Sequence, residues 1–334
     1  KVIAPPCVGG AILERINEET CSMSKNNRWL AIVNLLSGSG RCGRDWEHIA
    51  RMLYAKGIDF DTVFTGYRFH AIELAKRGIV EDGYRNLIAI GGDGTIHEVA
   101  NGILMQEEVP STEVRMGVIP VGTGNDWIRS FGIPRDYQQA VDVIAGGKEF
   151  VQDVAKTTFI GRSGNEESRY CVNVSGAGLD AFVNLRVCKN KDKGKNGKMS
   201  YMIGLAKSVL DYRSCRMAVR VDGENEAKGL IMSTAVGIGQ FNGSGMHQLP
   251  QSLADDGLLD VTVIETMSIP RILTVVGRLF DGKIYSVKRV HNYKGRTIEI
   301  SSDEVREVEI DGEPLGTTPV KYTIEDKRLK VLVP

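Results

Sequence analysis

The sequence has no excess of charge of either sign, no long apolar run and no internal repeat. Its 334 residues contain 42 Lys plus Arg and 42 Asp plus Glu, so the overall charge does not indicate nucleic-acid binding. No apolar segment approaches the roughly 18–20 residues of a membrane-spanning helix. The first 27 residues lack the basic-then-apolar order of a signal peptide. We therefore expect a cytoplasmic protein, long enough for two domains.

Paired cysteine motifs are also absent. None of the cysteines forms a CxxC pair, which argues against a zinc site and against a secreted disulfide scaffold. Reduced thiols in a cytosol are the simplest interpretation. The six cysteines are Cys7, Cys21, Cys42, Cys171, Cys188 and Cys215.

The segment Gly91–Thr95 reads GGDGT and lies between a short apolar run, Asn86–Ile90, and a segment with helical spacing, Ile96–Leu104. Glycines at such a junction allow close approach of a ligand, and the free amides of the new helix face an anion. A carboxylate at Asp93 repels phosphate unless a cation lies between them. The loop therefore predicts a metal–phosphate site, and the alternative is that Asp93 caps the helix.

Strands and helices alternate from residue 29 to about residue 147, which predicts an α/β fold with a doubly wound parallel sheet. In such sheets ligands bind outside the carboxyl ends of the strands. Polar or glycine-rich segments follow four of the expected strands: Asn34–Gly40, Thr65, Gly91–Thr95 and Pro120–Asp126. The expected strands are Trp29–Asn34, Asp59–Thr65, Asn86–Ile90 and Arg115–Pro120, and the expected helices are Asp45–Lys56, His70–Lys76 and Ile96–Leu104.

From about Phe150 the pattern changes to short apolar or β-branched segments separated by turns, which predicts a β-rich sandwich or barrel. Asp222-Gly223 and Asp311-Gly312 are hairpin signals. The expected strands are Tyr170–Val174, Met217–Val221, Leu230–Val236, Leu258–Ile264 and Thr297–Ile300, and one helix is expected at Ser200–Tyr212.

The lysine-rich segment Lys189–Lys198 is the one compositionally biased patch. A solvated loop is one interpretation. The other is contact with anionic lipid, to which each lysine near the surface contributes about 1 kcal/mol. On that second interpretation the protein is peripheral on the inner face of the membrane.

The motifs from Ile32 to the C-terminus resemble the diacylglycerol kinase catalytic-domain family, specifically its bacterial lipid kinases, which are related to sphingosine and ceramide kinases. Leu35 replaces the family's proline after Asn34, His97 stands where asparagine is common, and Ser252 replaces a common alanine. The matching segments are the NPxSG-type loop at Asn34, Ser37 and Gly38; the strand-end Thr65 followed by His70-Ala71; GGDGTxxEV at Gly91–Val99; PxGTGND at Pro120–Asp126; the run ending in DDGxLD at Gly243–Asp260; and DGE at Asp311–Glu313.

The resemblance implies a two-domain enzyme that uses ATP and Mg²⁺ and phosphorylates a lipid hydroxyl. It implies an N-terminal extension at residues 1–27, a phosphofructokinase- and NAD-kinase-like nucleotide domain at 28–153 to which a strand at 326–334 returns, and a lipid-substrate domain at 154–325. It also implies a structural magnesium site at Asp256 with the backbone of Leu253 and Leu258, supported by Asp260. The implied nucleotide-binding residues are Asn34, Ser37, Gly38, Thr65, Gly91, Gly92, Asp93, Gly94, Thr95, His97, Gly122, Thr123, Asn125 and Asp126.

An alcohol nucleophile loses its proton as it attacks phosphorus, and a carboxylate within reach is the natural acceptor. Glu313 is the favoured base, with Asp311 as the second candidate and Asp93 as the third catalytic carboxylate. An ordinary acidic hairpin at Asp311–Glu313 is the alternative. For the whole protein, the competing interpretations are an NAD kinase-like enzyme and a non-catalytic nucleotide- or lipid-sensing module.

Overall fold

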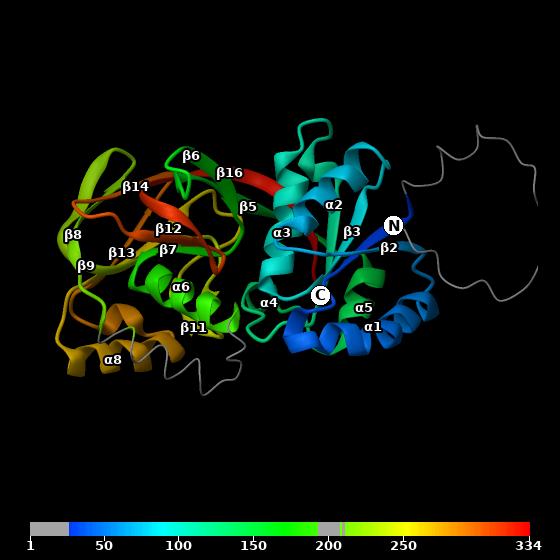
Figure 1. The fold of residues 1–334 in the computed structure, drawn as a ribbon, viewed down its shortest axis with the longest axis horizontal. Coiled ribbons are helices and arrows are strands. Elements are labelled where there is room, and N and C mark those ends of the chain that lie inside the picture. The colour runs from blue at the N-terminus through cyan, green and yellow to red at the C-terminus, as the bar shows by residue number, and fades with distance from the viewer. Residues whose placement is uncertain (1–26, 193–207, 209–210) are drawn as a thin grey trace, which may run out of the picture. The chain divides into compact units, whose positions relative to one another are not determined.

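The computed structural model describes residues 27–192, 208 and 211–334 of the chain. Two compact units make up the fold (Figure 1). The first, the N-terminal unit, contains the residues up to Gln152 together with Arg328–Pro334. The second, the C-terminal unit, is Asp153–Lys327. No helix within the described ranges is both long enough and apolar enough to cross a membrane.

The N-terminal unit alternates strands with helices, as its sequence pattern predicts. Its helices are α1 (Ser37–Ala55), α2 (His70–Val80), α3 (Asp93–Met105), α4 (Trp127–Phe131) and α5 (Tyr137–Gly146), with a 3₁₀ turn at Ser111–Glu113. Its strands are β1 (Trp29–Val33), β2 (Phe60–Phe64), β3 (Asn86–Gly91), β4 (Arg115–Pro120) and the end of β16 (Glu313–Leu332).

The strands of this unit form a parallel sheet in the order β16-β4-β3-β1-β2. The predicted doubly wound parallel sheet is therefore confirmed. The last strand joins the sheet through register pairs of Lys330 with Arg115 and of Val331 with Met116. Thus β16 runs from the C-terminal unit into the edge of the N-terminal sheet.

Helices cover both faces of the N-terminal sheet, which explains why its strands β1 and β3 are buried along their whole length. One face packs against α1 and α5, where Ile88 and Ile90 of β3 meet Ile49 and Ile144. Burying one such aliphatic side chain contributes roughly 1.5–3 kcal/mol. In Figure 1, α2 and α3 lie on the other side of these strands.

The C-terminal unit is mostly β, as predicted. Its helices are α6 (Leu179–Asp192) and α8 (Ile269–Phe280), with a 3₁₀ turn at Ile284–Ser286. Its strands are β5 (Glu149–Gly161), β6 (Glu166–Cys171), β7 (Val174–Gly178), β8 (Cys215–Val221), β9 (Glu224–Gly237), β10 (Phe241–Asn242), β11 (Met246–His247), β12 (Leu259–Glu265), β13 (Val290–Gly295), β14 (Thr297–Ser302), β15 (Glu307–Ile310) and most of β16.

Antiparallel pairing joins these strands in the order β13-β12-β9-β7-β15-β16, and β14 links β16 to β8. The main core contains inward-facing residues such as Val219, Val261 and Tyr322. Both hairpin predictions are confirmed. Asp222-Gly223 joins β8 to β9, and Asp311-Gly312 joins β15 to β16, each with two positive φ angles.

Three elements of this unit differ from the sequence prediction. The single strand expected at Tyr170–Val174 is wrong, because β6 ends at Cys171 and β7 begins at Val174. Between them, the amides of Val172 and Asn173 donate to the Asp311 carboxylate instead of to a neighbouring strand. Helices α6 and α8 were not predicted, although Pro270 at the start of α8 is a recognised helix-start signal. The helix expected at Ser200–Tyr212 lies mostly outside the described residues.

Candidate active site

The motif loops of the N-terminal unit follow strand ends that the parallel registers bring to one edge of the sheet. Val33 of β1 pairs with Phe64 of β2 and with Ile90 of β3. Gly91 in turn pairs with Pro120 of β4. Asn34, Thr65, the GGDGT loop and the loop after Pro120 therefore leave the sheet at the same edge, as expected for a ligand site.

Three polar side chains gather around Gly91. Asn34 Nδ2 donates to Thr95 Oγ1 at 3.2 Å, and Asn34 Oδ1 accepts the Leu36 amide at 3.1 Å. A Cβ on Gly91 would lie 2.3 Å from Thr95 Oγ1 and 3.0 Å from Ser37 Oγ. The absence of a side chain at Gly91 therefore leaves room for the polar groups of the first and third loops to meet.

The loop after β1 has left-handed backbone at Gly38, Ser39 and Gly40, with φ of 61°, 59° and 80°. The regular part of α1 begins after this turn. The sequence prediction, which starts the helix at Asp45, therefore covers only that regular part. A Cβ on Gly38 would lie 2.3 Å from the carbonyl oxygen of Val121. The first loop thus packs directly on the backbone of the fourth.

The third and fourth loops also touch, through Gly92 and Gly122. A Cβ on Gly122 would lie 2.6 Å from Gly92 Cα and 2.4 Å from Asn125 Oδ1. Two backbones approach this closely only where side chains are missing.

Asp93 joins the same two loops through its side chain. Asp93 Oδ1 accepts the backbone N–H groups of Asp126 at 2.7 Å and Trp127 at 3.1 Å, at the start of α4. Burial raises the pKa of Asp93 above its ordinary value, and the Trp127 and Asp126 amides oppose that shift. The carboxylate does not cap its own helix, whose N-cap residue is Gly92. It anchors the loop that precedes α4, and its role towards a metal stays a prediction.

Asn125 carries a buried acceptor that suits a cation or a ligand donor. It has positive φ and is 2 % exposed, and its Oδ1 has no hydrogen-bond partner among the described residues. Asp126, the next residue, has one carboxylate oxygen 3.4 Å from Arg129 Nε. Oxygen ligands of this kind suit Mg²⁺.

The remaining predicted nucleotide residues differ in accessibility. Thr123 is exposed, and Gly94 and Thr65 are half-buried at the same edge. His97 is 0 % exposed on α3, and Asn101 Nδ2 donates to its carbonyl at 3.0 Å and lies 3.4 Å from its ring. His97 is thus buried within the fold, and its contact with a nucleotide stays a prediction.

In the C-terminal unit, the DGE turn holds its two acids in different ways. Both Asp311 carboxylate oxygens are engaged: Oδ2 accepts the Val172 amide at 2.9 Å, and Oδ1 accepts the Asn173 amide at 2.9 Å and the Cys171 thiol at 3.1 Å. Asp311 therefore anchors the β6–β7 connection. Glu313, half-buried as the first residue of β16, is the better candidate base.

Sequence reasoning missed a buried acid behind this turn. Glu309 on β15 is 0 % exposed, and its Oε2 accepts the Gly312 amide at 2.6 Å. Asn242 Nδ2 donates to Glu309 Oε1 and to Gln248 Oε1, both at 3.3 Å, and Gln248 Nε2 donates to Asp180 Oδ2 at 2.8 Å. Burial raises the pKa of Glu309 well above its ordinary value, and the nearby Asp180 charge adds to that shift. The alternation of acids in Glu307–Asp311 was the available signal.

The expected magnesium site at Asp256 contains a lysine. Asp256 Oδ1 accepts the Leu258 amide at 3.1 Å, and its Oδ2 lies 3.4 Å from Lys294 Nζ. Lys294 Nζ also lies 3.1 Å from Asp260 Oδ2. Leu253 is exposed beside this loop. The side chains therefore do not fit a divalent ion at Asp256, since both of its carboxylate oxygens are engaged, one by the Leu258 amide and the other by the ammonium group of Lys294.

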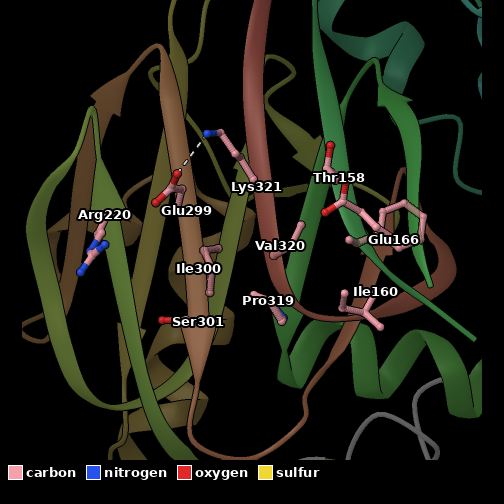
Figure 2. Close-up of a pocket in the computed structure, with 11 residues that line it drawn as sticks. Thr158, Ile160, Glu166, Arg220, Glu299, Ile300, Ser301, Pro319, Val320 and Lys321 are labelled. Atoms are coloured by element: carbon pink, nitrogen blue, oxygen red, sulfur yellow. Dashed lines mark ion pairs between the residues drawn. The ribbon is translucent and has the colours of Figure 1, made fainter. Parts of the chain in front are cut away.

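Figure 2 shows a pocket of about 460 Å³ in the C-terminal unit. Glu299 and Lys321, 3.1 Å apart, form an ion pair on its lining. None of the motif residues lines this pocket, so it is not the expected site. The labelled lining residues are Thr158, Ile160, Glu166, Arg220, Glu299, Ile300, Ser301, Pro319, Val320 and Lys321.

Two family models match consecutive parts of the chain. Residues 28–157 match the diacylglycerol kinase catalytic domain, and residues 173–333 match the YegS C-terminal NAD kinase beta sandwich-like domain. Residues 28–157 therefore carry a domain of the diacylglycerol kinase catalytic-domain family. The expected enzyme class, a kinase of a lipid-kinase family, is confirmed at that level.

Two curated relatives match this chain over most of their length. A diacylglycerol kinase of Bacillus subtilis (strain 168) is 25 % identical over 291 residues, which is 86 % of this chain and 91 % of that protein. One from Staphylococcus carnosus (strain TM300) is 27 % identical over 303 residues, 91 % of this chain and 94 % of that protein. A solved Bacillus anthracis str. Sterne protein assigned to the diacylglycerol kinases has a TM-score of 0.74 at 25 % identity, covering 93 % of this chain and 96 % of that one.

Proposed function

We propose that this kinase transfers the γ-phosphoryl group of ATP to a hydroxyl of diacylglycerol or a related lipid, with Mg²⁺. The observation that carries the nucleotide half is the contact of three motif loops at one sheet edge, through Gly38, Gly92 and Gly122. Backbone amides gathered at such an edge suit phosphate oxygens. The lipid half rests on the relatives, which carry the name diacylglycerol kinase.

In the proposed reaction the lipid hydroxyl oxygen bonds to the γ-phosphorus, the bond to the β-phosphate oxygen breaks, and ADP leaves. The hydroxyl proton goes to the Glu313 carboxylate, which acts as general base. Two carboxylates hold the turn that carries Glu313. Asp311 accepts the amides of the β6–β7 connection, and Glu309 accepts the Gly312 amide within the turn. A base held in one orientation contributes through positioning as well as through its basicity.

Mg²⁺ would neutralise charge on the phosphate oxygens when bound. Asn125 Oδ1, the buried oxygen without a partner among the described residues, and the adjacent Asp126 carboxylate are the groups that would hold it. Asp93 fixes the loop that carries both. These residues therefore also define where the nucleotide would bind in the N-terminal unit.

We also propose that the segment Lys189–Lys198 makes peripheral contact with anionic lipid. The side chains of this segment lie outside the described residues. Vesicle flotation of the wild-type chain and of a variant with these lysines changed to glutamine tests it. We expect the variant to lose binding to anionic vesicles, most clearly at low salt.

The proposed reaction is tested with radiolabelled ATP and a panel of acceptors in detergent micelles. The panel contains diacylglycerol, monoacylglycerol, a sphingoid base, undecaprenol, phosphatidylglycerol and, as a separate aqueous arm, NAD. We expect label in the lipid fraction, highest with diacylglycerol. Label in NADP supports the NAD kinase-like alternative instead. ATP binding without any labelled product supports a non-catalytic module.

A further inference from the structure

The loop before β12 comprises residues 251–258 and contains Asp255-Asp256-Gly257; it is called the DDG loop. Together with β12 it places three oxygen atoms around the ammonium group of Lys294 on strand β13. Lys294 Nζ lies 3.1 Å from the carbonyl oxygen of Gln251, 3.4 Å from Asp256 Oδ2 and 3.1 Å from Asp260 Oδ2. The ammonium donates hydrogen bonds to the Gln251 and Asp256 oxygens and forms an ion pair with Asp260.

The sheet register fixes this arrangement. Asp260 of β12 and Lys294 of β13 are direct partners in an antiparallel pair, so their side chains lie on the same face. Asp260 is 0 % exposed, and a buried carboxylate requires a compensating charge. Lys294 supplies that charge from within the chain, and Asn292 Nδ2 lies 3.5 Å from the other Asp260 oxygen.

A divalent ion at Asp256 would compete with this ammonium. Asp256 Oδ1 already accepts the Leu258 amide, which leaves Oδ2 as the oxygen shared with Lys294. Mg²⁺ takes near-octahedral oxygen ligands at roughly 2.0–2.1 Å, so a bound ion at this oxygen would lie beside the ammonium and be repelled by it. Within the described residues no group of three or more His, Cys, Asp or Glu side chains is arranged to hold a metal.

We propose that the ammonium group of Lys294 takes the place of a divalent cation at the DDG loop, so that the C-terminal unit of this kinase holds the loop without metal. The lysine ties Gln251 and Asp256 of the loop to Asp260 at the start of β12. This inference concerns folding of the loop and is independent of the proposed lipid substrate.

The test is thermal unfolding of the full chain without nucleotide, in EDTA and in millimolar MgCl₂. We expect Mg²⁺ to change the Tm of the wild type and of Asp256→Asn by the same amount, because the DDG loop binds no ion in either. Lys294→Gln removes the charge, so its Tm in EDTA falls by roughly 4 °C or more. In this variant Mg²⁺ raises the Tm by more than it does in the wild type, and adding Asp256→Asn removes this extra rise. Lys321→Gln is the matched control, because Lys321 pairs with Glu299 on an exposed part of the same unit. We expect its Tm to respond to Mg²⁺ as the wild-type Tm does.

A larger Mg²⁺ response of the Tm in the wild type than in Asp256→Asn would overturn the proposal, as would a Lys294→Gln variant that matches the wild type in both buffers. If Lys294→Gln does not fold, binding of Mn²⁺ without nucleotide is measured by electron paramagnetic resonance on the wild type and on Asp256→Asn. Equal Mn²⁺ binding by the two proteins supports the proposal. Loss of one bound ion in Asp256→Asn contradicts it.

Discussion

Asp93 Oδ1 lies 2.7 Å from the backbone nitrogen of Asp126, a residue 33 positions further along the chain. This hydrogen bond joins the loop after β3 to the loop after β4. The same oxygen accepts the Trp127 amide, so one carboxylate fixes the start of α4. The residue that the sequence indicates as part of a metal–phosphate site therefore holds two of the motif loops together.

Replacing Asp93 separates its anchoring role from its charge. Asp93→Ala leaves the Asp126 and Trp127 amides without an acceptor, and each buried unpaired amide costs about 1–3 kcal/mol. Asp93→Asn keeps an acceptor oxygen and is expected to lose much less stability. Denaturant unfolding of both variants measures the difference. A D93A protein as stable as the wild type would show that these hydrogen bonds do not hold the loops.

Gly122→Ala tests the contact between the two glycine loops. The new Cβ would lie 2.4 Å from Asn125 Oδ1 and 2.6 Å from Gly92 Cα, so the loops must separate. Overpacking of this kind costs about 1–3 kcal/mol. Because the nucleotide is proposed to bind at these loops, we expect the affinity for ATP to fall by about tenfold or more. Calorimetric titration with ATP measures it.

Gly146→Ala is the matched control in the same unit, because a Cβ there meets no atom within 4 Å. We expect this variant to bind ATP like the wild type. Equal ATP affinity in the Gly122 and Gly146 variants would contradict the placement of the nucleotide at these loops.

Local patterns predict the parallel sheet and the position of its motif loops, because strand ends in such a sheet share one edge. They do not predict that Asp311 bonds the β6–β7 connection or that Lys294 faces Asp260. Both contacts depend on the register of strands far apart in the chain, which composition and spacing do not specify. The burial of His97 was not predicted for a related reason: a motif position does not show how deeply a side chain on α3 is buried.

Glu309 predicts a specific pH dependence of stability. Its folded-state pKa is raised, so its contribution to stability is fully present below the unfolded pKa of about 4.3 and is lost as pH rises through the folded value. Asp180 and Asp311 are the acids that add to this shift. Glu309→Gln does not titrate. The Tm of this variant minus that of the wild type is therefore expected to become more positive between about pH 5 and pH 8.

Thermal unfolding across that pH range measures the difference, with Glu166→Gln on the exposed strand β6 as the baseline. A difference between E309Q and wild type that is constant with pH, or that falls as pH rises, would show that Glu309 is not the group responsible.

The most direct test of the central claim is the turnover of ATP and diacylglycerol in mixed micelles by Glu313→Gln, with Asp311→Asn measured beside it. We expect E313Q to keep the wild-type Tm and ATP affinity while kcat falls by about 10²-fold or more, the scale of lost general-base catalysis. D311N weakens the hydrogen bonds to Val172 and Asn173, so it is expected to lower the Tm. Wild-type phosphorylation of diacylglycerol by E313Q, or no phosphorylated lipid from the wild-type protein, would contradict the account.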